Sequence, residues 1–192
     1  GIGAHGLRQT RNEVPDRRRC LSPQPLCVWK TFKCVMEMEN NRNILALDCA
    51  TTTGWCVGTV GKPITQWGEI KLNNGEVDLW KFLNEIAEQY NVTRILAEDI
   101  FLNKNVQTFE RLANYHGVIN LFCQLRGIEL VRKGLSPTQW KRALVGDAYA
   151  SKDKVRGYVS KYVNTPIKSA NVSDAIGIFI AWQRLRRLRG VR

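Results

Sequence analysis

From residue 43 onward, strand-like runs alternate with long amphipathic stretches in an order that few folds can accommodate. Three short apolar runs, "NILALDC", "GWCVGTV" and "ITQWGEI", are separated by turn residues, which predicts an antiparallel meander of three strands. Apolar residues then recur at helical spacing in "EVDLWKFLNEIAEQY", and "TRILAED" follows as a strand of the buried type. This half of the chain therefore predicts an α/β fold.

The remainder predicts a second long helix, a short strand and three further helices. The helix in "NVQTFERLANYHGVINLFCQLRG" is expected to stop at Gly127, and "IELVR" supplies the strand. Pro137 opens one predicted helix, Ser151 is the expected N-cap of the next, and Asn171 or Ser173 that of the last. This order predicts a mixed five-stranded sheet, an antiparallel three-strand meander plus parallel strands, flanked by helices.

Residues 1–40 differ from the rest of the chain. They show no sustained period of 2 or 3.6 residues and contain three prolines, so we expect a poorly ordered leader. Because Met36 and Met38 lie just before the first strand, one hypothesis is that this leader is upstream sequence outside the folded unit. The folded domain is predicted at 41–183 and an Arg-rich C-terminal tail at 184–192.

The chain is strongly basic, with 29 Lys and Arg residues against 17 Asp and Glu and a formal net charge of +12. Clustered cations bind nucleic acid by releasing its condensed counterions, which predicts a polyanionic partner, although anionic lipid is an alternative. No apolar run reaches the roughly 18–20 residues of a spanning helix, and the N-terminus lacks the apolar core of a signal peptide. We therefore expect a soluble, cytoplasmic protein with no membrane partner.

The six cysteines give little support for a metal site or a disulfide framework. They include no C-x-x-C pair of the kind found in zinc sites, and they are too sparse for a secreted disulfide scaffold. Cys20, Cys27 and Cys34 are seven residues apart but have no second pair of ligands nearby. A zinc site there is the less favoured interpretation.

Three acidic residues are predicted to meet at one edge of the sheet. Asp48 and Glu98 end strand-like runs, and ligands bind at the carboxyl ends of parallel strands. Asp174 lies near the start of the last predicted helix, where a carboxylate suits the helix dipole. Each acid alone has an ordinary explanation as a turn, strand-end or first-turn residue. Together they predict a site for Mg²⁺ or Mn²⁺, and a pair of such ions about 4 Å apart supports phosphodiester cleavage.

Four segments resemble, in order and spacing, the signature segments of RuvC-type Holliday-junction resolvases: "ILALDCATTTGWCV", "ILAEDIFLNKNVQTFERLANYHGVI", "WKRALVGDAYASKDKV" and "NVSDAIGIFIAW". The resemblance covers residues 43–183. It implies a ribonuclease-H-like fold and the resolution of four-way DNA junctions by metal-dependent hydrolysis. It also implies that Asp48, Glu98 and Asp174 bind the metal, which would be Mg²⁺ or Mn²⁺ as two ions.

The resemblance extends to further site residues. Asn171 stands where the family has a fourth ligand, His or Asp; its amide oxygen can coordinate a hard metal but brings no charge. Lys141 and Lys152 match lysines that assist the transition state, where a cation offsets developing charge. Lys154 is the alternative to Lys152, whereas Asp99 is left out because strand alternation turns it to the opposite face.

The resemblance also implies DNA contacts and a dimer. Phe101 matches an aromatic residue near the junction centre, where stacking on an unpaired base is worth ~1–3 kcal/mol. Two symmetric sites in a homodimer would cut opposed strands of a junction. The basic residues expected to contact nucleic acid are Lys104, Arg142 and Lys154. The apolar stripe expected at the dimer interface contains Phe109, Leu112, Tyr115, Val118 and Ile119.

Three other functions are compatible with parts of this sequence. An actin-like ATPase or sugar kinase has a turn similar to "LDCATTTG", but this chain is too short for the two domains that close over ATP. A catalytically weak protein of the same fold that binds branched nucleic acid stays open, because Asn171 is uncharged and the C-terminal end is rich in arginine. A related nuclease acting on other DNA or on RNA also stays open.

Overall fold

A computed structural model describes residues 42–64, 66–100 and 105–188. The expected leader at 1–40, the candidates Phe101 and Lys104, and the last four residues lie outside the described residues. Within the described ranges, no helix is both long and apolar enough to cross a membrane.

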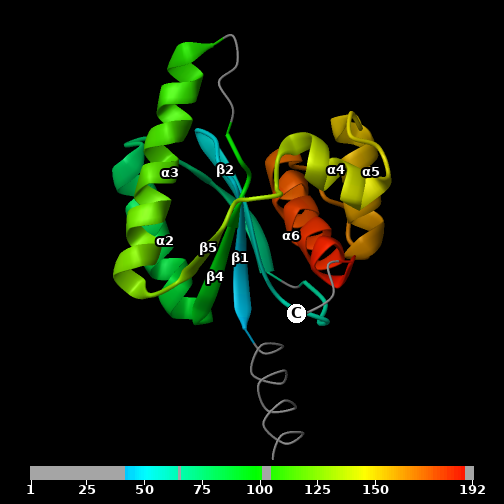
Figure 1. The fold of residues 1–192 in the computed structure, drawn as a ribbon, viewed down its shortest axis with the longest axis horizontal. Helices are drawn as coiled ribbons and strands as arrows, with labels where there is room; N and C mark the ends of the chain where they lie inside the picture. The colour runs from blue at the N-terminus through cyan, green and yellow to red at the C-terminus, as the bar shows by residue number, and fades with distance from the viewer. Residues whose placement is uncertain (1–41, 65, 101–104, 189–192) are drawn as a thin grey trace, which may run out of the picture. The chain divides into compact units, whose positions relative to one another are not determined.

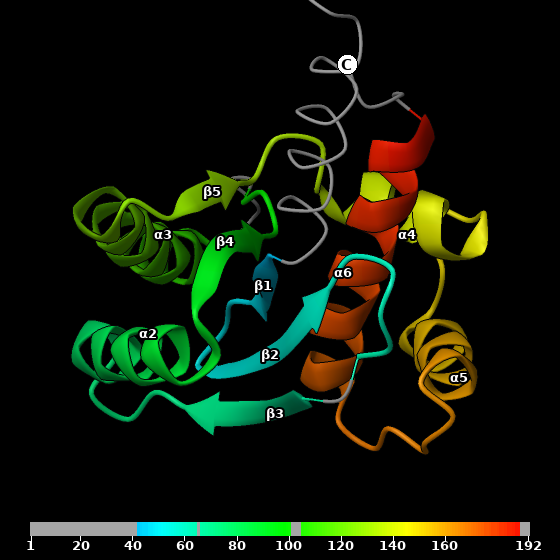
Figure 2. The same ribbon diagram turned by 90° about the horizontal axis from the view of Figure 1, so that it is seen from below.

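The described residues form one five-stranded sheet in the order β3-β2-β1-β4-β5, which Figure 2 shows from below. The first three strands pair antiparallel, and β4 runs parallel to both β1 and β5. The predicted meander plus parallel strands is therefore confirmed. The strands are β1 (Asn43–Asp48), β2 (Thr52–Thr59), β3 (Gln66–Lys71), β4 (Val92–Ala97) and β5 (Glu129–Val131).

Helices cover both faces of this sheet (Figure 1). The helices are α2 (Glu76–Tyr90), α3 (Val106–Arg126), α4 (Pro137–Val145), α5 (Lys152–Tyr162) and α6 (Ala170–Leu188). Alternation along β1 divides the core in two, because Leu45 and Leu47 pack with α2 and α3 while Ile44 and Ala46 pack with α4, α5 and α6. The side chain of Asp48 continues the second series and belongs to the α6 face.

Most of the predicted helix ends are found where the sequence signals place them. Gly127 ends α3 in the left-handed conformation, with φ 64°. Ser136 precedes Pro137 at the start of α4, where the side-chain oxygen of Gln139 accepts from the Ser136 backbone N–H at 3.3 Å. The hydroxyl of Ser151 accepts from the backbone N–H of the third helical residue at 3.2 Å and caps α5.

The predicted N-cap of the last helix is wrong. The helix α6 begins at Ala170, and the hydroxyl of Ser169 accepts from the backbone N–H of Val172 at 3.3 Å. A capping serine two residues before Asn171 competes successfully with the two predicted caps. Asp174 consequently lies in the second turn of α6. The helix dipole acts mainly within the first turn, so it does not explain an acidic residue at this position. The segment expected as a tail from residue 184 begins inside the same helix.

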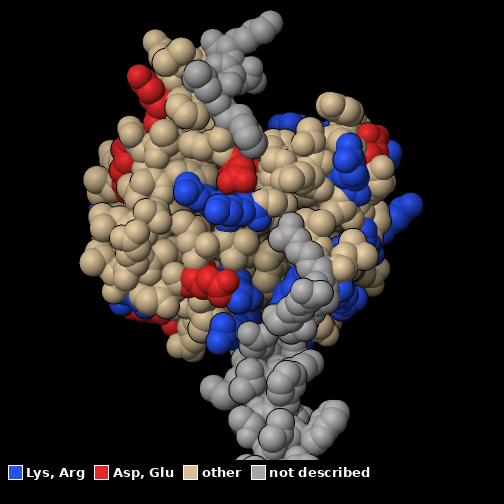
Figure 3. All heavy atoms as spheres, viewed as in Figure 1, with Lys and Arg blue, Asp and Glu red and all other residues tan. Residues whose placement is uncertain are grey.

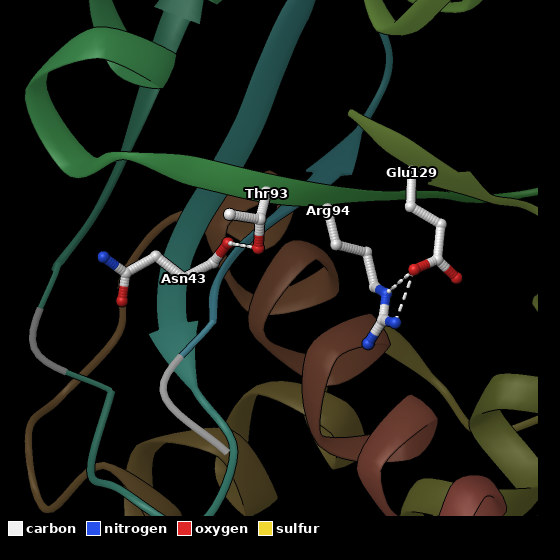
Figure 4. A network of polar contacts seen from close by, with 4 residues as sticks. All are labelled: Asn43, Thr93, Arg94 and Glu129. Atoms are coloured by element: carbon white, nitrogen blue, oxygen red, sulfur yellow. Dashed lines mark hydrogen bonds and ion pairs between the residues drawn. The ribbon is translucent and has the colours of Figure 1, made fainter. Parts of the chain in front are cut away.

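The buried Arg94 on β4 pairs with the half-exposed Glu129 on β5 and contacts α6, away from the carboxyl edge. In Figure 4, Arg94 and Glu129 point toward each other from neighbouring strands; Arg94 donates through Nε at 2.8 Å and Nη2 at 2.5 Å. The Arg94 guanidinium also lies 5.1 Å from the ring centroid of Trp182 on α6. This buried cation is therefore paired, as its loss of hydration requires.

Candidate active site

Asp48 and Glu98 lie side by side because of strand register. The parallel pairing of β1 and β4 aligns Leu47 with Ala97, so the next residue of each strand is one of the two acids. Neighbouring strands are about 4.8 Å apart. Ala46 and Leu96, two residues earlier, both pack in the core under α6, so alternation directs both carboxylates to that same face.

Asp174 reaches this edge because α6 approaches the sheet unusually closely. Gly54 on β2 is the register partner of Asp48, and a Cβ at Gly54 would lie 2.1 Å from the backbone carbonyl oxygen of Asn171. The side-chain Nδ2 of Asn171 donates to the carbonyl of Thr52 at 2.9 Å and fixes the contact. The start of α6 therefore lies beside Asp48, with Asp174 three residues further along the helix.

The three acids and two lysines influence one another's charge. Burial, followed by the negative charges of Asp174 and Glu98, raises the pKa of Asp48 to about 7. The positive charges of Lys152 and Lys141 act on Asp48 in the opposite direction. Burial likewise raises the pKa of Asp174, and the same two lysines oppose it. The five residues that the sequence predicts to be catalytic therefore come from β1, the residue after β4, α4, α5 and α6, and the other four lie close enough for their charges to act on Asp48.

Glu98 has an additional partner. Its Oε1 accepts a hydrogen bond from the indole Nε1 of Trp140 on α4 at 2.8 Å. Burial raises the pKa of Glu98 to about 7, while the bond from Trp140 lowers it by stabilising the ionised carboxylate. Lys141 lies next in sequence, and its Nζ is 5.6 Å from the Trp140 ring centroid.

Carboxylate oxygens are suitable ligands for a hard divalent cation. In the described residues, no three His, Cys, Asp or Glu side chains already converge as a ready-made metal cage. Burial raises the pKa values of Asp48, Glu98 and Asp174, and the charge of Asp174 raises those of Asp48 and Glu98 further, so a divalent cation beside these carboxylates would stabilise their ionised forms. Asn171 offers only its amide oxygen, since its Nδ2 is bonded to Thr52.

Arg142 and Lys154, the two described candidates for nucleic-acid contacts, lie on the α4–α5 side. Arg142 is exposed on α4, and Lys154 on α5 forms an ion pair with Asp147 at 3.0 Å. Figure 3 shows several separate basic side chains on this side of the face in view and a further group near the middle of that face. The basic residues of α4 and α5 are Lys141, Arg142, Lys152, Lys154, Arg156 and Lys161. Such a surface suits a phosphate backbone passing the acidic edge.

Sequence reasoning missed Trp140 and Gly54. Trp140 has the spacing of an ordinary core residue on an amphipathic helix, and nothing in that pattern identifies the acceptor of its N–H. The glycine at position 54 did carry a signal, because a glycine inside a strand pattern often marks the close approach of another backbone.

Comparison with known proteins identifies the family to which this fold and these residues correspond. The family model described as crossover junction endodeoxyribonuclease RuvC matches residues 57–182. That range contains Glu98, Asp174 and both candidate lysines, and it begins after Asp48. The crossover junction endodeoxyribonuclease RuvC of Ehrlichia canis (strain Jake) is 29% identical over 146 residues, which cover 71% of this chain and 92% of that protein.

Two solved structures share the fold. Thermus thermophilus RuvC has a TM-score of 0.66 and 17% identity, with 77% of this chain and 96% of that chain covered. The T. thermophilus RuvC in complex with a Holliday junction substrate also gives a TM-score of 0.66, at 15% identity and the same coverage. The expected ribonuclease-H-like fold is thereby confirmed.

Proposed function

The chain belongs to the family of crossover junction endodeoxyribonuclease RuvC, and on this basis we propose that it is a structure-selective endonuclease that resolves four-way DNA (Holliday) junctions. The observation that carries this proposal is the adjacency of Asp48 and Glu98 at the carboxyl edge, with Asp174 close enough to act on the charge of Asp48. A similar fold is known in complex with a Holliday junction substrate.

The residues of the candidate site have different proposed roles. Asp48, Glu98 and Asp174, with the amide oxygen of Asn171, would hold Mg²⁺ or Mn²⁺ as two ions. When bound, these ions activate water and offset charge on the scissile phosphate. Lys141, whose charge acts on Asp48, is placed to stabilise negative charge that develops during cleavage.

Lys152 has the same electrostatic relation to the acids and is exposed at the start of α5. Lys154 is the weaker candidate for this role, since its ammonium is paired with Asp147. Arg142, also exposed, would bind the phosphate backbone beside the site. Phe101 and Lys104 remain proposals from the family resemblance.

We further propose that the chain acts as a homodimer through α3. Tyr115 and Ile119, two members of the predicted interface stripe, are buried in the chain's own core. Leu121 and Leu125, one turn apart on α3, are instead 51% and 67% exposed, so these two leucines offer the apolar surface. Two copies would present two sites to opposed strands of one junction.

The test is cleavage of a four-way junction extruded from a supercoiled plasmid, with Mg²⁺, Mn²⁺ or a chelator. A dimeric resolvase makes both nicks within one binding event and yields linear plasmid. Linear duplex and RNA–DNA hybrid are the comparison substrates and should stay intact. Equal cutting of all three substrates would replace the proposal with a general nuclease.

One alternative has a specific observation in its favour. The side-chain Nδ2 of Asn171 is bonded to Thr52, and the amide carries no charge, which weakens the fourth metal ligand. A protein that binds branched DNA without cutting it would bind the extruded junction tightly and leave the plasmid supercoiled in every metal tested. That result would favour the binding protein over the resolvase.

A further inference from the structure

Trp140 is a core residue that also contacts two residues of the candidate active site. It is 1% exposed and lies on α4, against α6 at Gly177, where a Cβ would be 3.0 Å from the indole ring. Gly177 is three residues after Asp174, nearly one helical turn. The absence of a side chain at Gly177 thus gives the indole its place beside the acidic edge.

The indole has a single polar atom, and that atom is directed at Glu98. A buried tryptophan N–H is a donor only and needs one acceptor, which Glu98 Oε1 provides at 2.8 Å. A carboxylate that accepts such a bond is held in one orientation and favoured in its ionised form. Both properties are those required of a metal ligand.

The ring face of the same residue holds a cation. Nζ of Lys141 lies 5.6 Å from the Trp140 ring centroid, within the range of a cation–π contact. One buried side chain therefore contacts a candidate metal ligand through its edge and a candidate transition-state lysine through its face.

We propose that Trp140 is a positioning residue that orients the Glu98 carboxylate for metal binding through its indole N–H and restrains Lys141 through its ring. The inference rests on the proposed function for its biological meaning but concerns metal binding, which is measurable separately. The informative variant is Trp140→Phe, because phenylalanine removes the N–H and keeps an aromatic face for Lys141.

The experiment measures Mg²⁺ and Mn²⁺ binding to the full chain by calorimetry, together with junction affinity and melting temperature. Loss of an outer partner of a metal ligand commonly weakens metal binding about 10–100-fold. We expect Trp140→Phe to weaken binding about tenfold, with junction affinity in chelator unchanged within about twofold. Cleavage, where present, should recover at high metal concentration.

The matched control is Trp182→Phe, the same change in the same core. Trp182 is 9% exposed and contacts Arg94 and Arg186. This variant should leave metal affinity unchanged. Equal loss in the two variants, or undiminished affinity in Trp140→Phe, would overturn the inference, as would a wild-type chain that binds no metal.

A second measurement does not depend on how well Trp140→Phe folds. The indole N–H resonance of Trp140 should move upfield in Glu98→Ala, because its carboxylate acceptor is removed. It should also shift when Mg²⁺ is added to the wild type. A resonance unmoved by both changes contradicts the inference. Wild-type metal binding that responds to Trp140 without junction cleavage would instead refute only the proposed function.

Discussion

Asp48 and Glu98 occupy equivalent places on adjacent strands, yet different neighbours compensate their charges. Asp48 is opposed by two carboxylates and relieved by Lys141 and Lys152. Glu98 has, in addition, a direct hydrogen bond from Trp140. Three half-buried carboxylates in one place cost folding free energy, and such local conflict is characteristic of functional sites.

A single residue elsewhere should control part of the pH dependence of stability. His116 on α3 is 3% exposed, and burial, with the nearby charge of Arg132, lowers its pKa to about 4. Between pH 6.5 and pH 4, the His116 side chain therefore binds more protons in the unfolded chain than in the folded chain. The His116 contribution is complete above pH 6.5 and is lost as pH falls, by about 1–2 kcal/mol after solvent screening.

The measurement is the free energy of unfolding in urea at several pH values, for wild type and His116→Asn. Asp48 and Glu98 have raised pKa values and shift stability in the opposite direction over the same range, so only the difference between the two proteins isolates His116. We expect that difference to shrink from pH 7 to pH 4. A difference independent of pH would show that His116 does not titrate as described.

Among the elements, α6 packs against the sheet so closely that side chains at two positions of β2 would prevent the contact. It packs on the sheet over Gly54 and Gly58, and a Cβ at Gly58 would lie 2.6 Å from the ring of Phe179. Strand β2 thus presents backbone where other strands present side chains, and the helix closes onto it.

Gly54→Ala should therefore displace the start of α6. The new methyl would meet backbone at 2.1 Å, which has little freedom to give way. We expect a loss of about 1–3 kcal/mol in the free energy of unfolding and a larger proportional loss of cleavage, because Asp174 moves away from Asp48.

The control is Gly157→Ala on α5, where a Cβ would meet nothing within 4 Å. Alanine at that exposed helix position should be neutral or slightly stabilising. Unfolding in urea and junction cleavage measure both variants. Unchanged stability in Gly54→Ala would contradict the prediction, because it would mean that α6 can move away from β2 without loss of free energy.

The elements also show which contacts are predictable from sequence. The place of Asp48 and Glu98 at one edge is predictable, because strand alternation and the carboxyl-end position are both local rules. The start of α6 is not predictable in this way, because Ser169, Asn171 and Ser173 are all residue types that cap helices, and the contact of Asn171 with β2 is not visible in the sequence. Trp140 escaped prediction because its acceptor is 42 residues away in sequence.

For the whole molecule, the distribution of charge separates two tasks. Six basic side chains lie on α4 and α5, and two of them, Lys141 and Lys152, are close enough to Asp48 at the carboxyl edge to act on its charge. The basic surface supplies affinity for DNA, which falls as salt rises, while the acidic edge repels phosphate unless a cation is bound. Binding and cleavage should therefore be separable by substitutions at the acidic edge.

The most direct test is the junction cleavage rate and, in chelator, the junction affinity of Asp48→Asn, with Asp78→Asn on α2 as the control. Removing one of the three carboxylates proposed to bind the metal should slow cleavage on the order of 10³-fold. Junction affinity should stay within a few-fold or rise slightly, because a negative charge near phosphate is lost. The control should behave as wild type in both measurements. Undiminished cleavage by Asp48→Asn, or an equal loss of cleavage and binding, would contradict the assignment of these carboxylates as the catalytic centre.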